Sequence, residues 1–159
     1  MPARSLSILQ LLVRVALAGV FLVAAASKLA DPASLAQTIA NYRVLPEGAV
    51  GAAALLVPAA ELVIGVALLA GPYVQGGGVL GALMLLVFAA GMAQAKLRGI
   101  DLDCGCFGAA SDTLVSWPKV ALNVIGACAA LWVAFSPRAR WSELFPPAGS
   151  SPSAGQVQG

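Results

Sequence analysis

Hydrophobic residues occur in this chain as long uninterrupted blocks, without the one-sided pattern of helices in soluble proteins. A membrane-spanning helix needs about 20 apolar residues, whereas a surface helix keeps a polar face. The block over 76–95 has no polar side chain until Gln94, so it requires apolar surroundings on every side. The pattern predicts an all-α membrane protein, a bundle of four transmembrane helices at 6–27, 49–70, 76–95 and 118–136.

Shorter stretches that contain proline, glycine or charge separate these blocks. We expect a loop at 30–48, a tight turn at Gly71-Pro72, a loop at 96–119, and a transmembrane domain over 1–145 followed by a disordered Pro/Gly/Ser-rich tail at 146–159. The first block has the short basic start of a signal peptide. Its apolar run is longer than usual for a signal peptide and contains Arg14, which favours a retained helix.

Composition supports the membrane assignment and excludes several kinds of chemistry. The chain is 60% hydrophobic and 10% charged, whereas soluble domains carry about 25% charged residues. The net charge of +2 is scattered, which argues against nucleic-acid binding. The chain has no histidine, and therefore lacks the usual general base and the commonest metal ligand. No metal site is predicted.

The distribution of basic residues leaves the membrane orientation open. Four spans put both termini on one side and the loops at 30–48 and 96–119 on the other. The positive-inside rule compares Lys and Arg on the two sides. The two sides balance, three against four: Arg4, Arg138 and Arg140 with the termini, and Arg43, Lys96, Arg98 and Lys119 with the loops.

Two charges, Arg14 and Glu61, fall inside the predicted spans, where an unpaired charge is costly. Their depths, calculated from helix rise, agree on the same side of the membrane. We therefore expect an intramembrane ion pair, either a clamp between helices or part of a polar cavity for a proton or a quinone head group. Lys28 is expected to reach the head groups, and Asn123 is expected to hydrogen-bond between helices.

The sequence Asp101-Leu102-Asp103-Cys104-Gly105-Cys106 contains the one cluster suited to covalent chemistry. Thiol–disulfide exchange requires an exposed thiolate and a second sulfur that resolves the mixed disulfide. Cys104 and Cys106 supply such a redox pair, although the neighbouring carboxylates disfavour a thiolate. A structural disulfide, a soft metal site and two inert thiols remain alternatives. Cys128 is expected to be buried and unreactive.

Together these residues resemble the MauE/DoxX family of redox-associated membrane proteins, and most of all its methylamine-utilisation branch, MauE. The resemblance covers about residues 8–135. It is carried by Arg14, Lys28-Leu29-x-Asp31-Pro32, Asn41-Tyr42-Arg43-x-Leu45-Pro46, Pro58-x-x-Glu61-x-x-x-Gly65, Asp103-Cys104-Gly105-Cys106-Phe107-Gly108 and Asn123.

The resemblance implies a DoxX-like bundle in the bacterial inner membrane, with Cys104 and Cys106 on the periplasmic side. It implies a role in the maturation, through processing, transport or disulfide formation, of the disulfide-rich methylamine dehydrogenase beta subunit. A thioredoxin-like protein is the other implied partner, and a membrane quinone is a possible electron acceptor. Two alternatives remain, namely a quinone-linked thiol or thiosulfate oxidoreductase subunit and a non-catalytic scaffold or transporter component. Whether the chain is itself an enzyme stays open.

Overall fold

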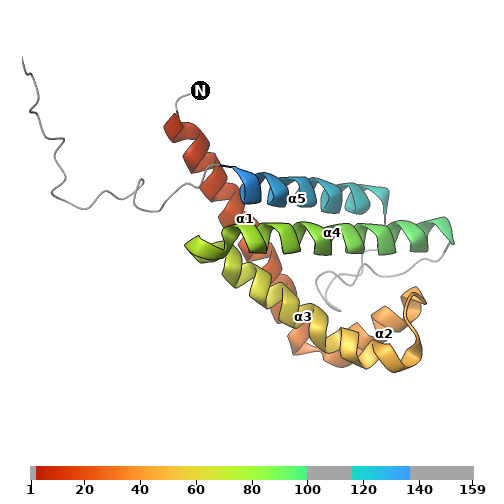
Figure 1. Cartoon of the computed structure of the whole chain (residues 1–159). Helices are drawn as coiled ribbons and strands as arrows, with labels where there is room; N and C mark the ends of the chain where they lie inside the picture. The colour runs from red at the N-terminus through yellow and green to blue at the C-terminus, as the bar shows by residue number, and fades with distance from the viewer. Residues whose placement is uncertain (1–2, 100–115, 137–159) are drawn as a thin grey trace, which may run out of the picture.

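The computed structural model describes residues 3–99 and 116–136, with side chains from residue 6 onward. All regular elements in these ranges are helical (Figure 1). They are α1 (Ala3–Ala30), α2 (Pro32–Tyr42), α3 (Glu47–Leu69), the 3₁₀ turn η1 (Gly71–Tyr73), α4 (Val74–Leu97) and α5 (Trp117–Phe135).

Four of these helical stretches are long and apolar enough to cross a membrane, which confirms the predicted architecture. Each overlaps one of the predicted blocks, and they extend over Leu6–Ala30, Glu47–Leu69, Gly71–Leu97 and Trp117–Phe135. Their lengths of 19 to 27 residues match the hydrocarbon thickness of a bilayer. The expected tail lies outside the described residues, so its disorder remains a prediction.

The segment predicted as a loop at 30–48 contains the helix α2. Asp31 caps its N-terminus by accepting a hydrogen bond from the Ser34 amide at 3.0 Å, and Pro32 occupies the first helical position, which suits its missing N–H. Arg43 ends the helix in the left-handed conformation, with φ 51°. The Asp-Pro pair is a helix-start signal. The helix that follows has 11 residues and a short apolar face centred on buried Leu35, so α2 is too short to span a bilayer.

Small residues allow the helices to pack closely. The most extensive helix contacts are those of α4 with α5 and of α1 with α3, and α3 also contacts α4. A Cβ added at Gly77 would lie 3.0 Å from the Ala67 side chain, and one at Gly81 would lie 3.2 Å from Ile64, so both glycines pack against α3. Gly77-x-x-x-Gly81 thus lets α4 approach α3 closely, as small residues at this spacing do in membranes.

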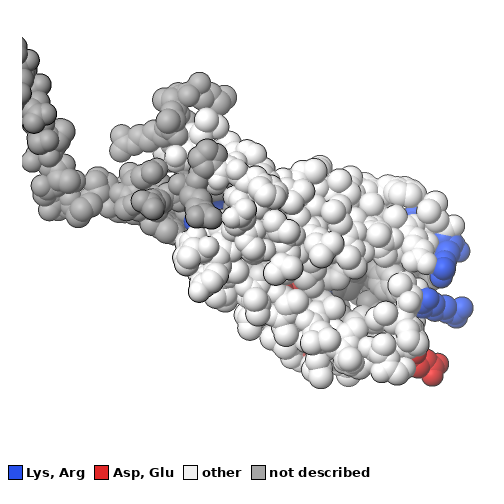
Figure 2. Space-filling view, viewed as in Figure 1, with Lys and Arg blue, Asp and Glu red and all other residues white. Residues whose placement is uncertain are grey.

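Along the described spans the outer surface is mostly apolar. Long aliphatic side chains such as Leu56 and Val63 are exposed along the spans, as lipid contact requires. Lys, Arg and Glu side chains gather at the end where α2 meets α3 and α4 ends (Figure 2), and Arg43, Glu47 and Arg98 are exposed there. The chain leaves α4 and enters α5 at this same end (Figure 1), which we call the charged end.

Candidate functional site at the interface of α1 and α3

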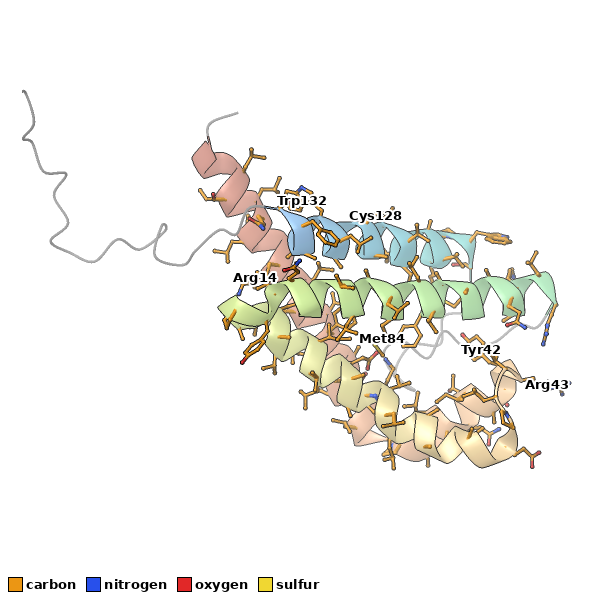
Figure 3. The ribbon with its side chains drawn as sticks, in the orientation of Figure 1. Arg14, Tyr42, Arg43, Met84, Cys128 and Trp132 are labelled. Carbon is orange, nitrogen blue, oxygen red and sulfur yellow. The ribbon has the colours of Figure 1, made fainter. Side chains whose placement is uncertain are left out.

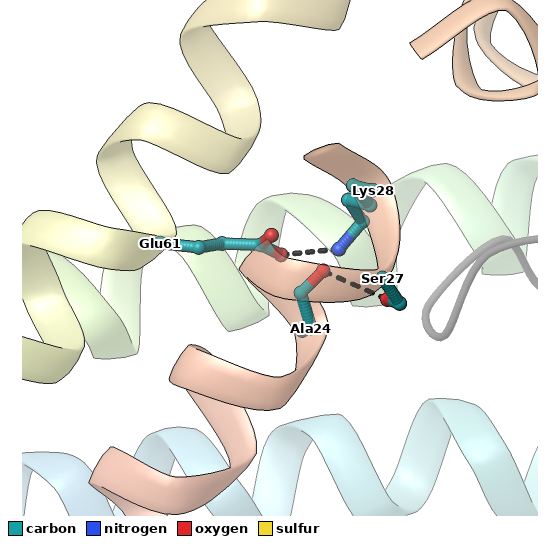
Figure 4. A network of polar contacts seen from close by, with 4 residues as sticks. All are labelled: Ala24, Ser27, Lys28 and Glu61. Carbon is teal, nitrogen blue, oxygen red and sulfur yellow. Dashed lines mark hydrogen bonds and ion pairs between the residues drawn. The ribbon is translucent and has the colours of Figure 1, made fainter. Parts of the chain in front are cut away.

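A buried ion pair joins α1 to α3. The Lys28 ammonium donates to Oε1 of Glu61 (Figure 4), and the two residues are 3% and 1% exposed. Glu61 lies in the middle of α3, one turn after Pro58, which lacks the N–H that would bond to the carbonyl of Ala54. Both charges are removed from water, so each is stabilised by the opposite charge of its partner, and loss of one would leave the other buried and uncompensated.

Lys28 turns into the bundle, contrary to the expectation that it would reach the head groups. It lies two residues before the end of α1. Side chains on a helix lean toward its N-terminus, so from this position the Lys28 stem is directed back into the membrane. Its Nζ lies 5.3 Å from the centroid of the Phe88 ring on α4, within the range of a cation–π contact.

The second carboxylate oxygen of Glu61, Oε2, is buried and has no hydrogen-bond partner among the described residues. Buried polar atoms in native proteins are nearly always paired, because an unpaired one loses its hydration without compensation. A carboxylate can accept several hydrogen bonds, and here Oε1 accepts one from Lys28. Oε2 therefore remains an available acceptor inside the bundle.

Arg14 makes a different kind of contact. Its Nε donates to the Leu68 carbonyl and its Nη2 donates to the Leu69 carbonyl at 2.7 Å, while the residue is 5% exposed. The last carbonyls of a helix have no partner within the helix and carry partial negative charge. Arg14 thus fastens the C-terminal end of α3 to α1.

The structure accordingly gives Arg14 and Glu61 different partners instead of the predicted contact with each other. Leu68 and Leu69 are seven and eight residues beyond Glu61, or about 10–12 Å along α3. Arg14 and Glu61 have similar depths when residues are counted from the span ends, but Lys28 competes for Glu61. Lys28, near the end of α1 that leads into α2, reaches Glu61 in the middle of α3, whereas Arg14 lies level with the end of α3.

The remaining residues singled out from the sequence are the three cysteines and Asn123. Cys104 and Cys106 lie outside the described residues, so their redox role remains a prediction. Cys128 is exposed on α5, not buried as expected, because α5 packs through Ala127 and Ala130 and turns the next position outward (Figure 3). Asn123 donates to the Lys119 carbonyl at 3.0 Å within its own helix, not between helices as expected.

These features define a polytopic α-helical membrane protein whose bundle contains a charged pair with an available acceptor oxygen. The family described as methylamine utilisation protein MauE matches residues 6–136. The chain belongs to this family.

Two relatives carry the name methylamine utilization protein MauE. The protein from Paracoccus denitrificans is 38% identical over 122 residues, which is 76% of this chain and 66% of the relative. The protein from Paracoccus versutus is 34% identical over 119 residues, which is 74% of this chain and 64% of the relative. The chain thus spans slightly less than two thirds of these curated relatives. No solved structure matches it.

Proposed function

We propose that this chain is a membrane accessory protein of methylamine utilisation that exchanges disulfides with a periplasmic client through Cys104 and Cys106. The observation that carries the proposal is the family match over residues 6–136, which includes both cysteines. The names of the two relatives supply the metabolic setting. From the family resemblance we infer that the client is the disulfide-rich beta subunit of methylamine dehydrogenase and that the membrane is the bacterial inner membrane.

The arrangement of the helices supports an exchange site that a protein can reach. The segment with Cys104 and Cys106 joins Leu97 of α4 to Trp117 of α5. Both of these residues belong to the charged end of the molecule (Figures 1 and 2). A folded client approaches this end from water, without having to enter the bilayer. Disulfides persist in the periplasm, so we place this end on the periplasmic side.

The proposed exchange consists of two substitutions at sulfur. A client thiolate attacks the Cys104–Cys106 disulfide, forms a mixed disulfide and releases one cysteine of the chain as a thiolate. A second client thiolate then attacks the mixed disulfide, which leaves the client oxidised and the chain with two thiols. The two electrons and two protons pass next to the disulfide of a thioredoxin-like protein, which restores the pair.

Trapping of the mixed disulfide tests the proposal. Exchange is reversible, so in Cys106→Ser the Cys104 thiolate attacks a disulfide of the client and releases one client thiolate. Without Cys106 to displace the client, we expect a client joined to Cys104 that is released by reductant. Cys104→Ser tests the reciprocal attack. Cys128→Ser is the matched control, because this thiol is exposed in the middle of α5; it should leave both the trapped species and client maturation unchanged.

Two results would overturn the exchange mechanism. The first is normal client maturation in the Cys104→Ser/Cys106→Ser variant, which would make the chain a non-catalytic scaffold. The second is labelling of the two cysteines by a membrane-impermeant maleimide only from the cytoplasmic side. The first result bears on chemistry and the second on orientation, so the two failures are distinguishable.

A further inference from the structure

We propose that Glu61, Lys28 and Phe88 form a binding site for the hydroxyl-bearing head group of a lipid-soluble molecule. This inference is independent of the exchange at Cys104 and Cys106. It begins from Oε2 of Glu61, a buried acceptor without a donor among the described residues. Such an atom is stabilised by a hydroxyl that donates to it, and the hydrogen bond is strengthened by the charge of the carboxylate.

Lys28 provides a donor beside this acceptor. An ammonium group carries three N–H donors. One points to Oε1 of Glu61, and the cation also lies over the Phe88 ring. The pair therefore offers a donor and an acceptor next to each other, with an aromatic surface alongside. This arrangement is complementary to a head group in which a hydroxyl is adjacent to a second oxygen.

Phe88 provides the route from lipid to the charged pair. Glu61 and Lys28 are almost fully buried, whereas Phe88 is half-buried, as is Met84 one turn earlier on α4. Met84 points from α4 toward the side on which α1 and α3 lie (Figure 3). A rotation of the flexible Met84 and of the Phe88 ring would admit a head group while its tail stays among apolar side chains.

The depth of the pair is appropriate for an amphipathic ligand. The Cα of Lys28 is two residues from the end of α1, or about 3 Å along the helix axis, and its side chain leans inward. Glu61 lies in the middle of α3, so the head group would lie inside the bundle between α1 and α3, with its tail among apolar side chains. Two sources share this chemistry, the glycerol head of phosphatidylglycerol and the ring of a membrane hydroquinone.

Binding to the full chain in phosphatidylcholine nanodiscs distinguishes these sources. One arm adds phosphatidylglycerol and the other a short-chain alkyl hydroquinone, and native mass spectrometry counts the molecules bound. We expect one molecule per chain in one arm. Lys28→Met/Glu61→Gln, which removes both charges together and so avoids an unpaired buried charge, should weaken binding about 10–100-fold, the value of one hydrogen bond to a charged group.

Two controls separate a specific site from general effects. Glu47→Gln removes an exposed carboxylate from the same helix and should leave binding unchanged. Cys104→Ser/Cys106→Ser should also bind normally, so that failure of the exchange proposal and failure of this one are distinguished. Equal binding by wild type and the Lys28→Met/Glu61→Gln variant in both arms would overturn the proposal. So would an absence of binding in both arms, which would leave water as the donor to Oε2.

Discussion

The two most extensive helix contacts in the molecule are built from different kinds of residue. Between α4 and α5 the contact consists of small side chains: a Cβ at Gly78 would lie 2.7 Å from the Ala130 carbonyl oxygen and 2.8 Å from the Ala134 side chain. Between α1 and α3, the buried residues include Arg14, Lys28 and Glu61. The buried residues of α4 and α5 are all apolar, whereas those of α1 and α3 include charges.

This difference indicates that the charges are not needed to hold helices together. In lipid, helices associate through close backbone packing, which α4 and α5 achieve with buried residues that are all apolar. The interface of α1 and α3 uses the same device at Gly65, where a Cβ would lie 2.7 Å from Leu22. The charged residues must therefore be explained separately, Arg14 by the carbonyls at the end of α3 and the Lys28–Glu61 pair by its available acceptor.

The largest expected effect comes from breaking the charged pair on one side only. Glu61→Ala leaves the Lys28 ammonium buried without its counter-ion, and we expect a loss of about 3–5 kcal/mol in the free energy of unfolding. The measurement is an unfolding titration in mixed detergent micelles, followed by circular dichroism. Lys28→Met/Glu61→Gln should recover most of the loss. Equal stability of Glu61→Ala and the exposed control Glu47→Ala would show that the pair is already hydrated.

Arg14 should matter less, because its partners are neutral carbonyls at a helix end, so their loss leaves no buried charge without its counter-ion. Arg14→Met removes the hydrogen bonds to Leu68 and Leu69, and we expect a loss of about 2–3 kcal/mol. Arg14→Lys should be more stable than Arg14→Met but less stable than wild type, since an ammonium lacks the fork of donors that contacts two carbonyls. Amide hydrogen exchange should accelerate at the end of α3. If hydrogen exchange accelerates around Glu61 instead, the Arg14 contact and the Lys28–Glu61 pair are coupled and cannot be treated as separate contacts.

The interface of small residues should be sensitive to size alone. Gly78→Leu places a side chain against Ala130 and Ala134, and we expect a loss of about 1–3 kcal/mol from overpacking. Gly76→Leu, two residues earlier on α4, is the matched control because no atom lies within 4 Å of its added Cβ. Both variants gain the same helix propensity, so the difference between their unfolding titrations isolates packing. No difference would mean that α5 can move away freely.

The sequence predicted the four spans because each is a continuous apolar block of bilayer length, and this signal does not depend on tertiary contacts. It missed α2, whose only local signals are the Asp31 cap and Pro32. A helix of 11 residues is placed in a polytopic protein mainly by what it packs against. Such packing cannot be seen in a single sequence.

The partners of the buried charges were harder still to predict from the sequence. Residue counting gives the depth of a Cα, but the side chains of Lys28 and Arg14 each extend several ångströms beyond it, in a direction set by the helix. Depth alone therefore could not decide which cation reaches Glu61. The one sequence signal for Lys28 as the partner of Glu61 was its place in the family pattern Lys28-Leu29-x-Asp31-Pro32. A lysine near a helix end is also expected to reach the head groups, and this expectation hid the signal.

The smallest expected effect concerns the one polar residue described within the apolar part of α5. Asn123 donates to the Lys119 carbonyl of its own helix, a bond that replaces no contact between helices. Asn123→Ala should therefore change the free energy of unfolding by less than about 0.5 kcal/mol, below the average interhelical hydrogen bond in membranes. The same unfolding titration measures it, with Ala121→Ser as a reverse control that adds an exposed hydroxyl two residues earlier. A loss of more than about 1 kcal/mol would mean that α4 and α5 also depend on a polar contact, and the contrast with α1 and α3 would then be one of degree.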